Sequence, residues 1–254
     1  MRCANTSVDF FPFSQVHTIK NAFLQVYQPH SIDFWPFRNV VTIGVSFLTN
    51  TMLESIDLSP FAYNLKSIGD SFMASSVNLQ EVDLAPLSKV TKIGSYFLVG
   101  SRLLSSIDLS PLESLLSLGR GCLSACTGLH TVLLPTFDSF SDIVIGKEFL
   151  SSCYGLKDLD LSPWHNMTSI PGEFLCQCTG LTHLDLTPFT SVTSVKFGFL
   201  SQCSGLIDID LSPLRNVRPP LLGFMDGCTG IAKIDMSPLV LLTEAERDEA
   251  LRGI

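Results

Sequence analysis

The chain has 254 residues, of which 46% are hydrophobic and 16% charged, so it is too apolar to be disordered and must bury a large core. Its formal net charge of −8 argues against nucleic-acid binding, which requires a basic surface. Residues 1–20 lack the continuous apolar stretch of a secretory signal, and no apolar run reaches the roughly 18 residues that a membrane span requires.

A short phrase of the form Ile-Asp-Leu-Ser-Pro recurs along almost the whole chain, at intervals of 24 to 27 residues. A near-constant interval of this size is typical of solenoids, in which each repeat is one structural unit that stacks on its neighbours. Leu133 takes the aspartate position in one unit, so the chain contains about ten units. The aspartates of the other units are Asp9, Asp33, Asp57, Asp83, Asp108, Asp160, Asp185, Asp210 and Asp235.

Each unit is predicted to contain one strand and one short helical turn. Apolar and polar residues alternate across the aspartate, which indicates a strand with one buried face, and the proline ends pairing because it has no N–H. The Phe-Leu-x-x-Cys segment that follows has helical spacing, and the glycine after it suits a helix C-terminus that needs a left-handed residue. The sequence therefore predicts a repeat solenoid with parallel strands on one side and turns on the other. These glycines are Gly128, Gly155, Gly180, Gly205 and Gly230.

The unit resembles the BspA-like, treponemal-type leucine-rich repeats of bacterial and protozoan surface antigens. The resemblance covers residues 5–242 and rests on the Leu-x-x-Ile-x-Leu strand, the nearby proline, the Ile-Gly step and the Phe-x-x-x-Cys turn. The chain departs from the family in the aspartate inside almost every strand and in a Ser-Pro pair where a single proline is more usual. The resemblance implies a right-handed leucine-rich-repeat superhelix and protein–protein or adhesive binding rather than catalysis.

The first two units carry aromatic residues where later units have serine. Phe11 and Trp35 take the outward position two residues after the aspartate, and Asn5 stands where a leucine is expected. Neighbouring exposed aromatics are typical of interfaces, and an uncapped solenoid end exposes apolar core. Three interpretations stay open for this end: a partner-binding patch, a homodimer interface, or the start of a truncated gene product.

Two columns of the repeat are predicted to fill the core. Five cysteines share one repeat position with Thr51 and Ser101, which indicates a small, semi-buried slot for reduced thiols rather than disulfides or a zinc site. Reduced thiols and the lack of a signal favour a cytoplasmic protein, whereas a truncated N-terminus would favour the cell surface. The cysteines are Cys126, Cys153, Cys178, Cys203 and Cys228. The second column, a predicted hydrophobic spine, is Phe23, Phe47, Phe72, Phe97, Phe149, Phe174, Phe199 and Phe224.

The aspartate column admits two interpretations. Alternation places each aspartate on the outward face, so like charges lie about one strand spacing, ~4.8 Å, apart and repel. In the first interpretation, each carboxylate accepts the N–H of the serine two positions later, or a serine hydroxyl of the next unit, and braces the bend before the proline. In the second, the column is an acidic stripe that binds a basic peptide or cations, with raised carboxylate pKa values when no partner is bound.

The second interpretation is strongest late in the chain, where the outward positions add further acids. Just before this stretch, the unit of Leu133 is 27 residues long, and we expect a loop between Asp138 and Asp142. The candidate partner-binding residues are Asp158, Asp160, His183, Asp185, Asp208 and Asp210, together with Phe11 and Trp35 at the N-terminal end.

The C-terminal residues predict a helical cap. Thr243-Glu244-Ala245-Glu246 is a capping box that leads into a polar helix through about Leu251. We therefore assign residues 1–242 to the solenoid and residues 243–254 to a capping helix of the same domain.

No pattern in the sequence indicates catalysis. No Ser/His/Asp or Cys/His arrangement shares a pocket, and no phosphate-binding glycine loop occurs, so we expect neither an enzyme nor a cofactor or metal site. The sequence predicts a protein–protein interaction module that binds a protein or a basic peptide on its sheet face. A cell-surface adhesin or antigen is one alternative, and a structural or degenerate repeat fragment without a ligand is another.

Overall fold

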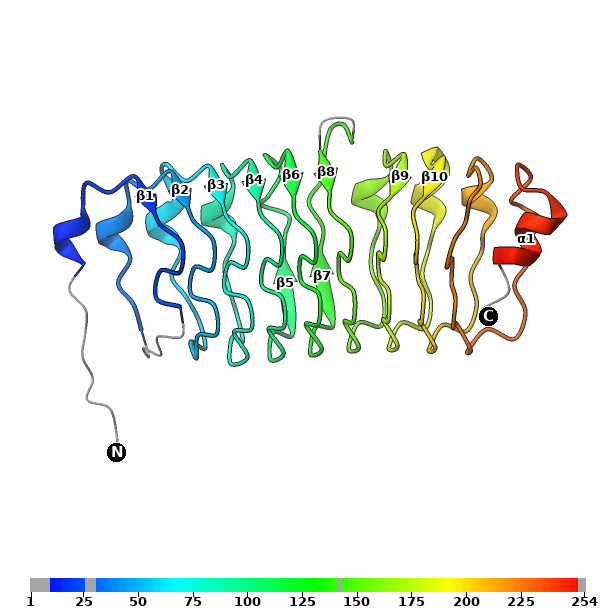
Figure 1. The fold of residues 1–254 in the computed structure, drawn as a ribbon, viewed down its shortest axis with the longest axis horizontal. Coiled ribbons are helices and arrows are strands. Elements are labelled where there is room, and N and C mark those ends of the chain that lie inside the picture. The colour runs from blue at the N-terminus through cyan, green and yellow to red at the C-terminus, as the bar shows by residue number, and fades with distance from the viewer. Residues whose placement is uncertain (1–9, 26–30, 141–142, 251–254) are drawn as a thin grey trace.

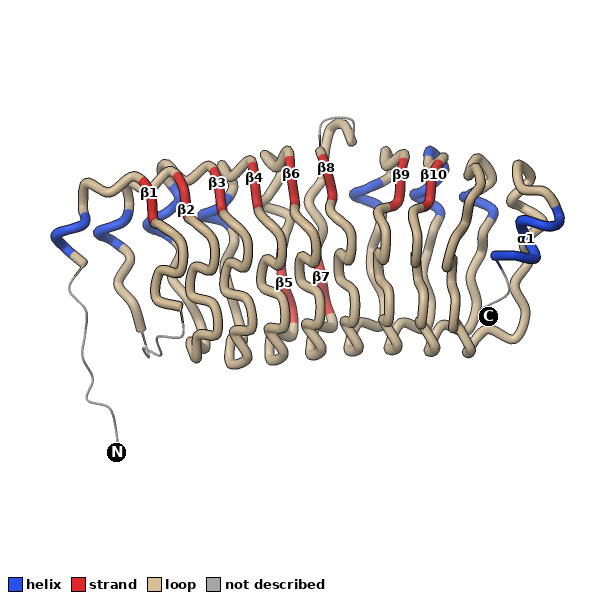
Figure 2. Tube along the Cα trace, in the orientation of Figure 1, coloured by secondary structure: helices blue, strands red, loops and turns tan. Residues whose placement is uncertain are grey.

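The computed structural model describes residues 10–25, 31–140 and 143–250. Its rungs stack in chain order into one elongated solenoid, which ends at helix α1 (Glu244–Ala250) (Figure 1). Short parallel strands and 3-10 turns alternate along the chain, and Figure 2 shows that loops and turns make up most of every rung. This is the leucine-rich-repeat solenoid that the periodic sequence predicts.

The strands pair in parallel between successive rungs, at the same repeat position in each. Thr18 lies opposite Thr42, for example, and Ile43 lies opposite Ile68. The main six-stranded sheet contains, in order, β1 (Thr18–Ile19), β2 (Thr42–Ile43), β3 (Ser67–Ile68), β4 (Lys92–Ile93), β6 (Ser117–Leu118) and β8 (Val144–Ile145). Two smaller sheets pair β9 (Ser169–Ile170) with β10 (Ser194–Val195), and β5 (Ser106–Asp108) with β7 (Thr131–Leu133).

Short 3-10 turns follow the aspartate segment in most rungs, and each has a proline in its first two positions. Proline suits the start of a turn because its missing N–H has no bond to make there and its φ is already close to the helical value. The turns are η1 (Phe11–Phe13), η2 (Trp35–Phe37), η3 (Ser59–Ala62), η4 (Ala85–Leu87), η5 (Ser162–Trp164), η6 (Thr187–Ser191) and η7 (Ser212–Leu214).

The main sheet does not lie where the aspartate pattern predicts the strand. It is formed by the later Ile-Gly segment of each rung. The aspartate segment keeps the predicted alternation, with Asp57 exposed and Leu58 buried, but among the described residues it forms a strand only in β5 and β7. Elsewhere isolated bonds join it to the next rung, such as that from the Gln80 N–H to the Glu54 carbonyl at 2.9 Å. Each rung thus has two extended segments, and placing the strand at the aspartate was wrong for most rungs.

The Phe-Leu-x-x-Cys segment is not the helical turn that its spacing predicts. Alternate residues are left-handed, with φ of 56° at Glu173, 55° at Leu175 and 61° at Gln177. The N–H groups of these alternate residues therefore bond to the following and the preceding rung in turn. Those of Glu173 and Gln177 donate to the following rung at 2.7 Å, and that of Leu175 donates to Phe149 of the preceding rung at 3.1 Å. These bonds offset the cost of left-handed backbone in residues that carry a Cβ. We call this stretch the zigzag segment.

The glycines after the cysteines allow close packing and do not end a helix. None of them has a positive φ. A Cβ on Gly155 would lie 2.9 Å from the Leu129 carbonyl oxygen, and a Cβ on Gly180 would overlap the carbonyl oxygen of Tyr154. The rungs meet here backbone to backbone, so the predicted helix C-terminus at these positions was wrong, although the need for glycine was not.

The predicted phenylalanine spine is confirmed. Phe72 and Phe97 stack with ring centroids 5.4 Å apart, and Phe149 and Phe174 stack at 5.8 Å. Cys122 takes the place of the phenylalanine between these two stacks and is itself buried. The spine therefore consists of two stacked columns of rings separated by one thiol.

The cysteine column is confirmed as part of the buried core. All five of its side chains are free thiols, and each Sγ lies 3.0 to 3.2 Å from a carbonyl oxygen of the preceding rung, as Cys178 does from Leu150. Burial raises the pKa of the Cys178 thiol to about 12. Ser76 and Ser101 take the same core position in earlier rungs, and their buried hydroxyls have no hydrogen-bond partner among the described residues.

Helix α1 begins with the predicted capping box. The N–H and the hydroxyl of Thr243 each lie 2.8 Å from Glu246 Oε2, and the Glu246 N–H donates to Thr243 Oγ1 at 3.3 Å. Arg247 ties the helix to the last rung, because its guanidinium donates to the Leu239 carbonyl at 2.9 and 3.2 Å. The predicted extension to Leu251 lies outside the described residues. No helix in the described ranges has the length and apolarity to cross a membrane.

Candidate functional site

Every column aspartate in the described residues takes part in the same turn. Its Oδ1 accepts the backbone N–H of the residue two positions later, at 2.8 to 2.9 Å. This bond holds the chain at the bend before the proline, so the structural interpretation of the column is confirmed. These aspartates are Asp33, Asp57, Asp83, Asp108, Asp160, Asp185, Asp210 and Asp235, while Asp9 lies outside the described residues.

The same turns lower carboxylate pKa values. Hydrogen bonds from the hydroxyl and the backbone N–H of Ser162 lower the pKa of Asp160, and those from Ser212 lower the pKa of Asp210. The next carboxylate along the column, Asp235, has only a minor opposing effect on the pKa of Asp210. The raised values expected from like-charge repulsion were wrong at these two positions. Both carboxylates are ionised at neutral pH, so the face that they share is anionic.

The positions two before, at and two after each aspartate form one long surface, which we call the acidic face. Lys233 is the only lysine or arginine at these positions in the described rungs. The turns fix where each aspartate sits, so the charges repeat from rung to rung in a regular row. The carboxylates of the acidic face are Asp33, Asp57, Glu81, Asp83, Asp108, Asp158, Asp160, Asp185, Asp208, Asp210 and Asp235.

The acidic face is hollowed in the first half of the chain. A groove of about 540 Å³ lies there, across three successive aspartate segments. One sequence signal points to this groove, the pair Glu81 and Asp83 on the same side of an extended segment. The acidic candidates predicted from the sequence all lie in later rungs. The groove is lined by Ser55, Ile56, Asp57, Glu81, Val82, Asp83, Ser106, Ile107 and Asp108.

The later candidates also lie on the acidic face. Asp158, Asp160, His183, Asp185, Asp208 and Asp210 are all exposed. The structure brings two of them together across adjacent rungs, where His183 Nδ1 lies 2.7 Å from Asp208 Oδ1. This contact and the nearby Lys233 engage or offset negative charge in this half, whereas Asp57, Glu81, Asp83 and Asp108 have no salt-bridge partner in the described part of the chain.

The aromatic candidates stand apart from the acids of the later rungs. Phe11 is 73% exposed and Trp35 is 49% exposed, on the consecutive turns η1 and η2. Beneath them the interior side is aromatic too, since Phe10 lies 5.3 Å from Phe37, measured between ring centroids. The predicted exposure of this aromatic end is confirmed.

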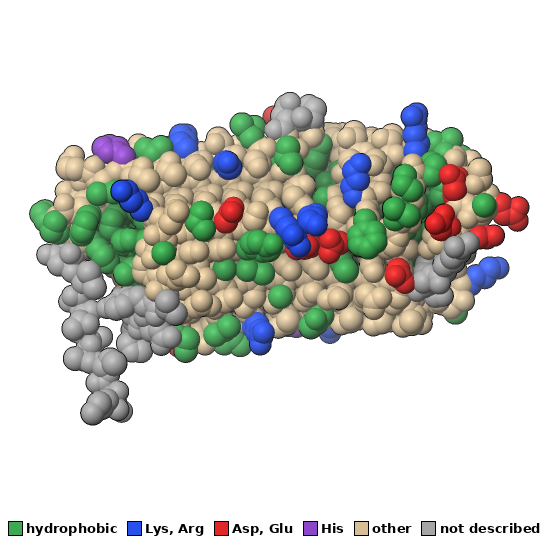
Figure 3. Space-filling view, viewed as in Figure 1, with side chains coloured by type: hydrophobic (Ala, Val, Ile, Leu, Met, Phe, Trp, Pro, Cys, Tyr) green, Lys and Arg blue, Asp and Glu red, His purple; other side chains and the backbone are tan. Residues whose placement is uncertain are grey.

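The side formed by the main sheet and the zigzag segments differs in charge from the acidic face. Figure 3 shows one long face of the molecule with lysine and arginine side chains spread along most of its length. Arg120 forms an ion pair with Glu148, and Lys147 lies 3.7 Å from Glu173. The exposed basic residues at these positions are Lys20, Lys66, Lys92, Arg120, Lys147, Lys196 and Arg218.

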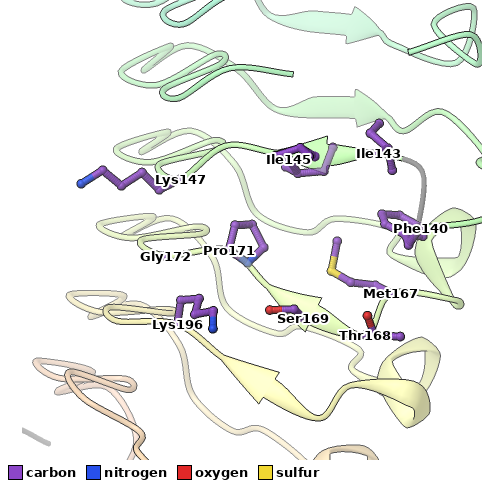
Figure 4. Close-up of a pocket in the computed structure, with 11 residues that line it drawn as sticks. Phe140, Ile143, Ile145, Lys147, Met167, Thr168, Ser169, Pro171, Gly172 and Lys196 are labelled. Carbon is purple, nitrogen blue, oxygen red and sulfur yellow. The ribbon is translucent and has the colours of Figure 1, made fainter. Parts of the chain in front are cut away.

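The main sheet is interrupted after β8. Among the described strands, β8 pairs with β6 on one side only, and β9 pairs only with β10. A cavity of about 340 Å³ opens where β8 and β9 would meet. Figure 4 shows Lys147 and Lys196 toward one end of this cavity, and Phe140, Met167 and Thr168 toward the other. The predicted loop of the long rung begins beside it, although residues 141–142 lie outside the described ranges.

The described residues contain no cluster of three or more His, Cys, Asp or Glu side chains arranged to hold a metal ion. The buried thiols of the cysteine column run in a line, one per rung, and donate to carbonyl oxygens.

Comparison with known proteins agrees with this architecture. The BspA type leucine rich repeat region, in 6 copies, matches residues 42–143 and 139–236. No curated protein matches the chain. Two solved structures of repeat proteins from Listeria monocytogenes resemble it at low identity.

The first of these structures is the functional domain of InlJ, described as including a cysteine ladder. It is 15% identical with a TM-score of 0.46, and the match covers 93% of this chain and 50% of that one. The second is the internalin InlF, at 17% identity and a TM-score of 0.20, covering 93% of this chain and 87% of that one. The present chain thus spans about half the length of the InlJ domain. Because the family match extends over most of its length, the chain belongs to the BspA-type leucine-rich repeat family.

Proposed function

We propose that this chain is a protein-interaction module that binds a basic, extended segment of a partner protein along its acidic face. Family and fold are those of leucine-rich-repeat proteins, which are typically non-enzymatic and serve in protein interaction or surface adhesion. The observation that carries the proposal is the row of exposed carboxylates on successive rungs, against a single lysine at the same positions.

The groove of the first half is the best-placed contact for such a segment. Asp57, Asp83 and Asp108 line it on three neighbouring rungs, and Glu81 adds a fourth carboxylate. Rungs are about 4.8 Å apart, so a basic peptide laid across them meets a new carboxylate at each step. Complementary charge of this kind raises the association rate and selects basic over acidic partners.

The turn bonds also prepare the groove for binding. The Oδ1 atoms of Asp57, Asp83 and Asp108 accept turn N–H groups at 2.8 to 2.9 Å, which restricts each side chain to one orientation. A side chain that is already ordered loses less conformational entropy when a partner binds. We extend the proposal to Asp158, Asp160, Asp185, Asp208 and Asp210 with His183, which continue the same row.

The test uses a fluorescein-labelled peptide of alternating lysine and serine, about ten residues long, which spans ~33 Å when extended. Asparagine can still accept the turn N–H but carries no charge. The triple variant Asp57→Asn, Asp83→Asn, Asp108→Asn therefore isolates the charge. We expect its affinity to fall about tenfold at low salt, from three exposed charge contacts of roughly 0.5 kcal/mol each.

The matched control is the triple variant Asp160→Asn, Asp185→Asn, Asp210→Asn, which removes the same charge from the later rungs. A smaller loss there supports the groove, and a larger loss moves the main contact to the later candidates. Equal binding by wild type and both variants, or no binding by wild type, overturns the proposal.

We make three further proposals, on the N-terminal end, the domain division and the cellular location. Exposed Phe11 and Trp35 support a second contact or a homodimer at the N-terminal end, which light scattering of Trp35→Ser against wild type tests directly. We also propose the division of the chain into a solenoid of residues 1–242 and a cap of residues 243–254, which the contact of Arg247 with Leu239 supports. A cytoplasmic location is supported by the free thiols; a cell-surface adhesin is the alternative, and cell fractionation separates the two.

A further inference from the structure

We propose that the opening between β8 and β9 is a second peptide-binding site, in which an extended segment of a partner protein inserts as an additional strand and places a carboxylate beside Lys147 and Lys196. We call this opening the slot. Its walls are Ile143, Val144 and Ile145 on one side and Ser169, Pro171 and Gly172 on the other, with Phe140 and Met167 at one end.

The slot has a cause in the sequence. From β2 to β8, the residue after each strand of the main sheet is glycine, and these glycines pack backbone to backbone. A Cβ on Gly94 would lie 2.6 Å from the Gly69 carbonyl carbon, and one on Gly146 would lie 2.5 Å from that of Gly119. Pro171 takes the next position in this column. Its ring adds bulk at this close contact. Bulk alone does not separate the strands, because Lys196 takes the position after Pro171 in this column and its N–H still donates to Ile170 at 3.1 Å.

Proline also removes the hydrogen bond that would close the sheet. At the earlier positions the glycine N–H donates to the preceding strand, as from Gly119 to Ile93 at 2.9 Å and from Gly146 to Leu118 at 2.7 Å. The equivalent bond to the Ile145 carbonyl requires an N–H at Pro171, which has none. Both the bulk and the missing donor of one residue therefore hold β8 and β9 apart.

The opening is confined to the sheet. Elsewhere the same two rungs remain in contact, since the Glu148 N–H donates to the Gly172 carbonyl at 2.8 Å and the Phe149 and Phe174 rings stack at 5.8 Å. Figures 1 and 4 both show β8 and β9 set further apart than the paired strands beside them. The slot is thus a local gap between two ordered strand edges, held open by a rigid stack.

A strand is the occupant that matches these edges. Strands β8 and β9 run in the same direction and each has one edge unpaired with any other described strand, which is the arrangement that strand addition uses. Across the slot, Ile145 and Ile170 continue the inward column to which Ile68, Ile93 and Leu118 belong. An inserted strand therefore meets the core through one apolar side chain and bonds on both sides through its backbone.

Charge selects among extended segments. Lys147 and Lys196 lie toward the same end of the slot, after the strand positions (Figure 4). Lys147 is only 3.7 Å from Glu173, whereas Lys196 has no salt-bridge partner in the described part of the chain. A carboxylate that follows the inserted strand completes this end. The slot therefore takes a segment with a carboxylate after its strand residues, unlike the acidic face, and the two sites have different partners.

The test uses a labelled peptide that copies residues 65–70 of this chain, Leu-Lys-Ser-Ile-Gly-Asp. In register, its isoleucine lies between Ile145 and Ile170, its glycine passes Pro171, and its aspartate reaches Lys147. We expect saturable binding to the intact chain, followed by fluorescence anisotropy. Methylating the backbone nitrogen of the isoleucine should weaken binding about tenfold, because it removes a ladder bond and adds bulk.

Variants of the protein locate the peptide. Pro171→Gly restores the glycine column and the missing N–H, so β8 and β9 pair and the peptide should lose at least about tenfold in affinity. Lys196→Glu should weaken binding several-fold, whereas Lys92→Glu, in strand β4 and away from the slot, should leave it unchanged. A thermal unfolding curve for Pro171→Gly at or above that of wild type shows that the variant is folded.

The outcomes are decisive in both directions. If the Pro171→Gly protein binds the peptide as tightly as wild type, the peptide adds at another edge, such as β1, and the proposal fails. If the methylated peptide binds unchanged, the cavity accepts apolar groups without strand pairing, and the proposal again fails. The methylated peptide needs no protein variant, so it remains informative if Pro171→Gly does not fold.

Discussion

The first and second halves of the solenoid follow the same backbone path but use different interactions. Up to β8, one unbroken sheet joins the rungs, and after β8 this sheet is interrupted. The small-residue position of the core holds Ser76 and Ser101 in the earlier rungs, whose hydroxyls have no hydrogen-bond partner among the described residues. From Cys126 onward the same position holds thiols that donate to carbonyl oxygens of the preceding rung. Since each contact is only between neighbouring rungs, a repeat protein can exchange one kind of bond for another along its length.

The largest expected effect tests whether the ring stack is equally important in both halves. Phe72→Ala and Phe174→Ala each remove a fully buried ring from a stacked column. We expect each to lower the free energy of unfolding by roughly 3–5 kcal/mol, measured by chemical denaturation. Phe13→Ala, at a half-exposed ring, serves as the control and should cost much less. An unchanged unfolding curve for Phe174→Ala contradicts the assigned core.

The next effect tests the thiol bonds of the second half. Cys178→Ser keeps a small polar group but shortens the side chain, so the hydroxyl is expected to be left buried without its bond to Leu150. The expected loss is about 1–3 kcal/mol, the cost of an unsatisfied buried polar group. Cys178→Ala, which leaves no buried donor, is the matched control and should cost less if the bond matters. A greater loss of unfolding free energy for Cys178→Ala shows that packing, rather than the hydrogen bond, dominates at this core position.

A smaller effect reverses the exchange in the first half. Ser101→Cys places a longer side chain at a core position where the serine hydroxyl has no hydrogen-bond partner among the described residues. The longer C–S bond brings the donor closer to the carbonyl of the preceding rung, as in the later rungs. We expect a gain of about 0.5–1.5 kcal/mol in unfolding free energy. Ser75→Cys, at the exposed position just before Ser76 in an earlier rung, should leave stability unchanged. Destabilisation by Ser101→Cys means that the earlier slot is too narrow for sulfur.

The smallest effect concerns acid. The folded-state pKa values of Asp160 and Asp210 are lowered by their serine turns. Such groups stabilise the fold above their unfolded pKa, near about 4, and lose that contribution as the pH falls through the lower folded value. Unfolding curves for wild type and Asp210→Asn should therefore differ at neutral pH and converge below about pH 3. A difference that stays constant with pH assigns the effect of the variant to something other than charge.

Positions that repeat at a fixed interval could be predicted from sequence. The buried slots of Phe174 and Cys178, and the turn at Asp160, follow from residue type and spacing because each recurs in almost every rung. The main strand was misplaced because two extended segments per rung share the same alternation, and only contacts between rungs decide which one pairs. The slot at Pro171 had a sequence signal, since this proline follows a column of glycines at the same repeat position. The signal can be interpreted only when it is known that these glycines directly follow the paired strands of the main sheet.

Backbone conformation could not be predicted from residue type in the zigzag segment. Leu175 has a φ of 55°, a region that leucine rarely adopts, and nothing in its side chain favours that conformation. The cause is collective, because the bonds to rungs above and below pay for it only once the stack exists. A helical turn, which needs only local bonds, was therefore the natural but wrong prediction.

The zigzag segment has a consequence for how such a chain grows and is edited. Its first and last left-handed positions accept side chains as different as Glu148 and Gly198, or Asn50 and Gln202, because they face away from the core. Joining two rungs thus depends on main-chain geometry rather than on particular side chains. Duplication, deletion or transplantation of a whole rung leaves compatible surfaces on both sides of the junction, so the length of the array is free to change while its cross-section stays the same.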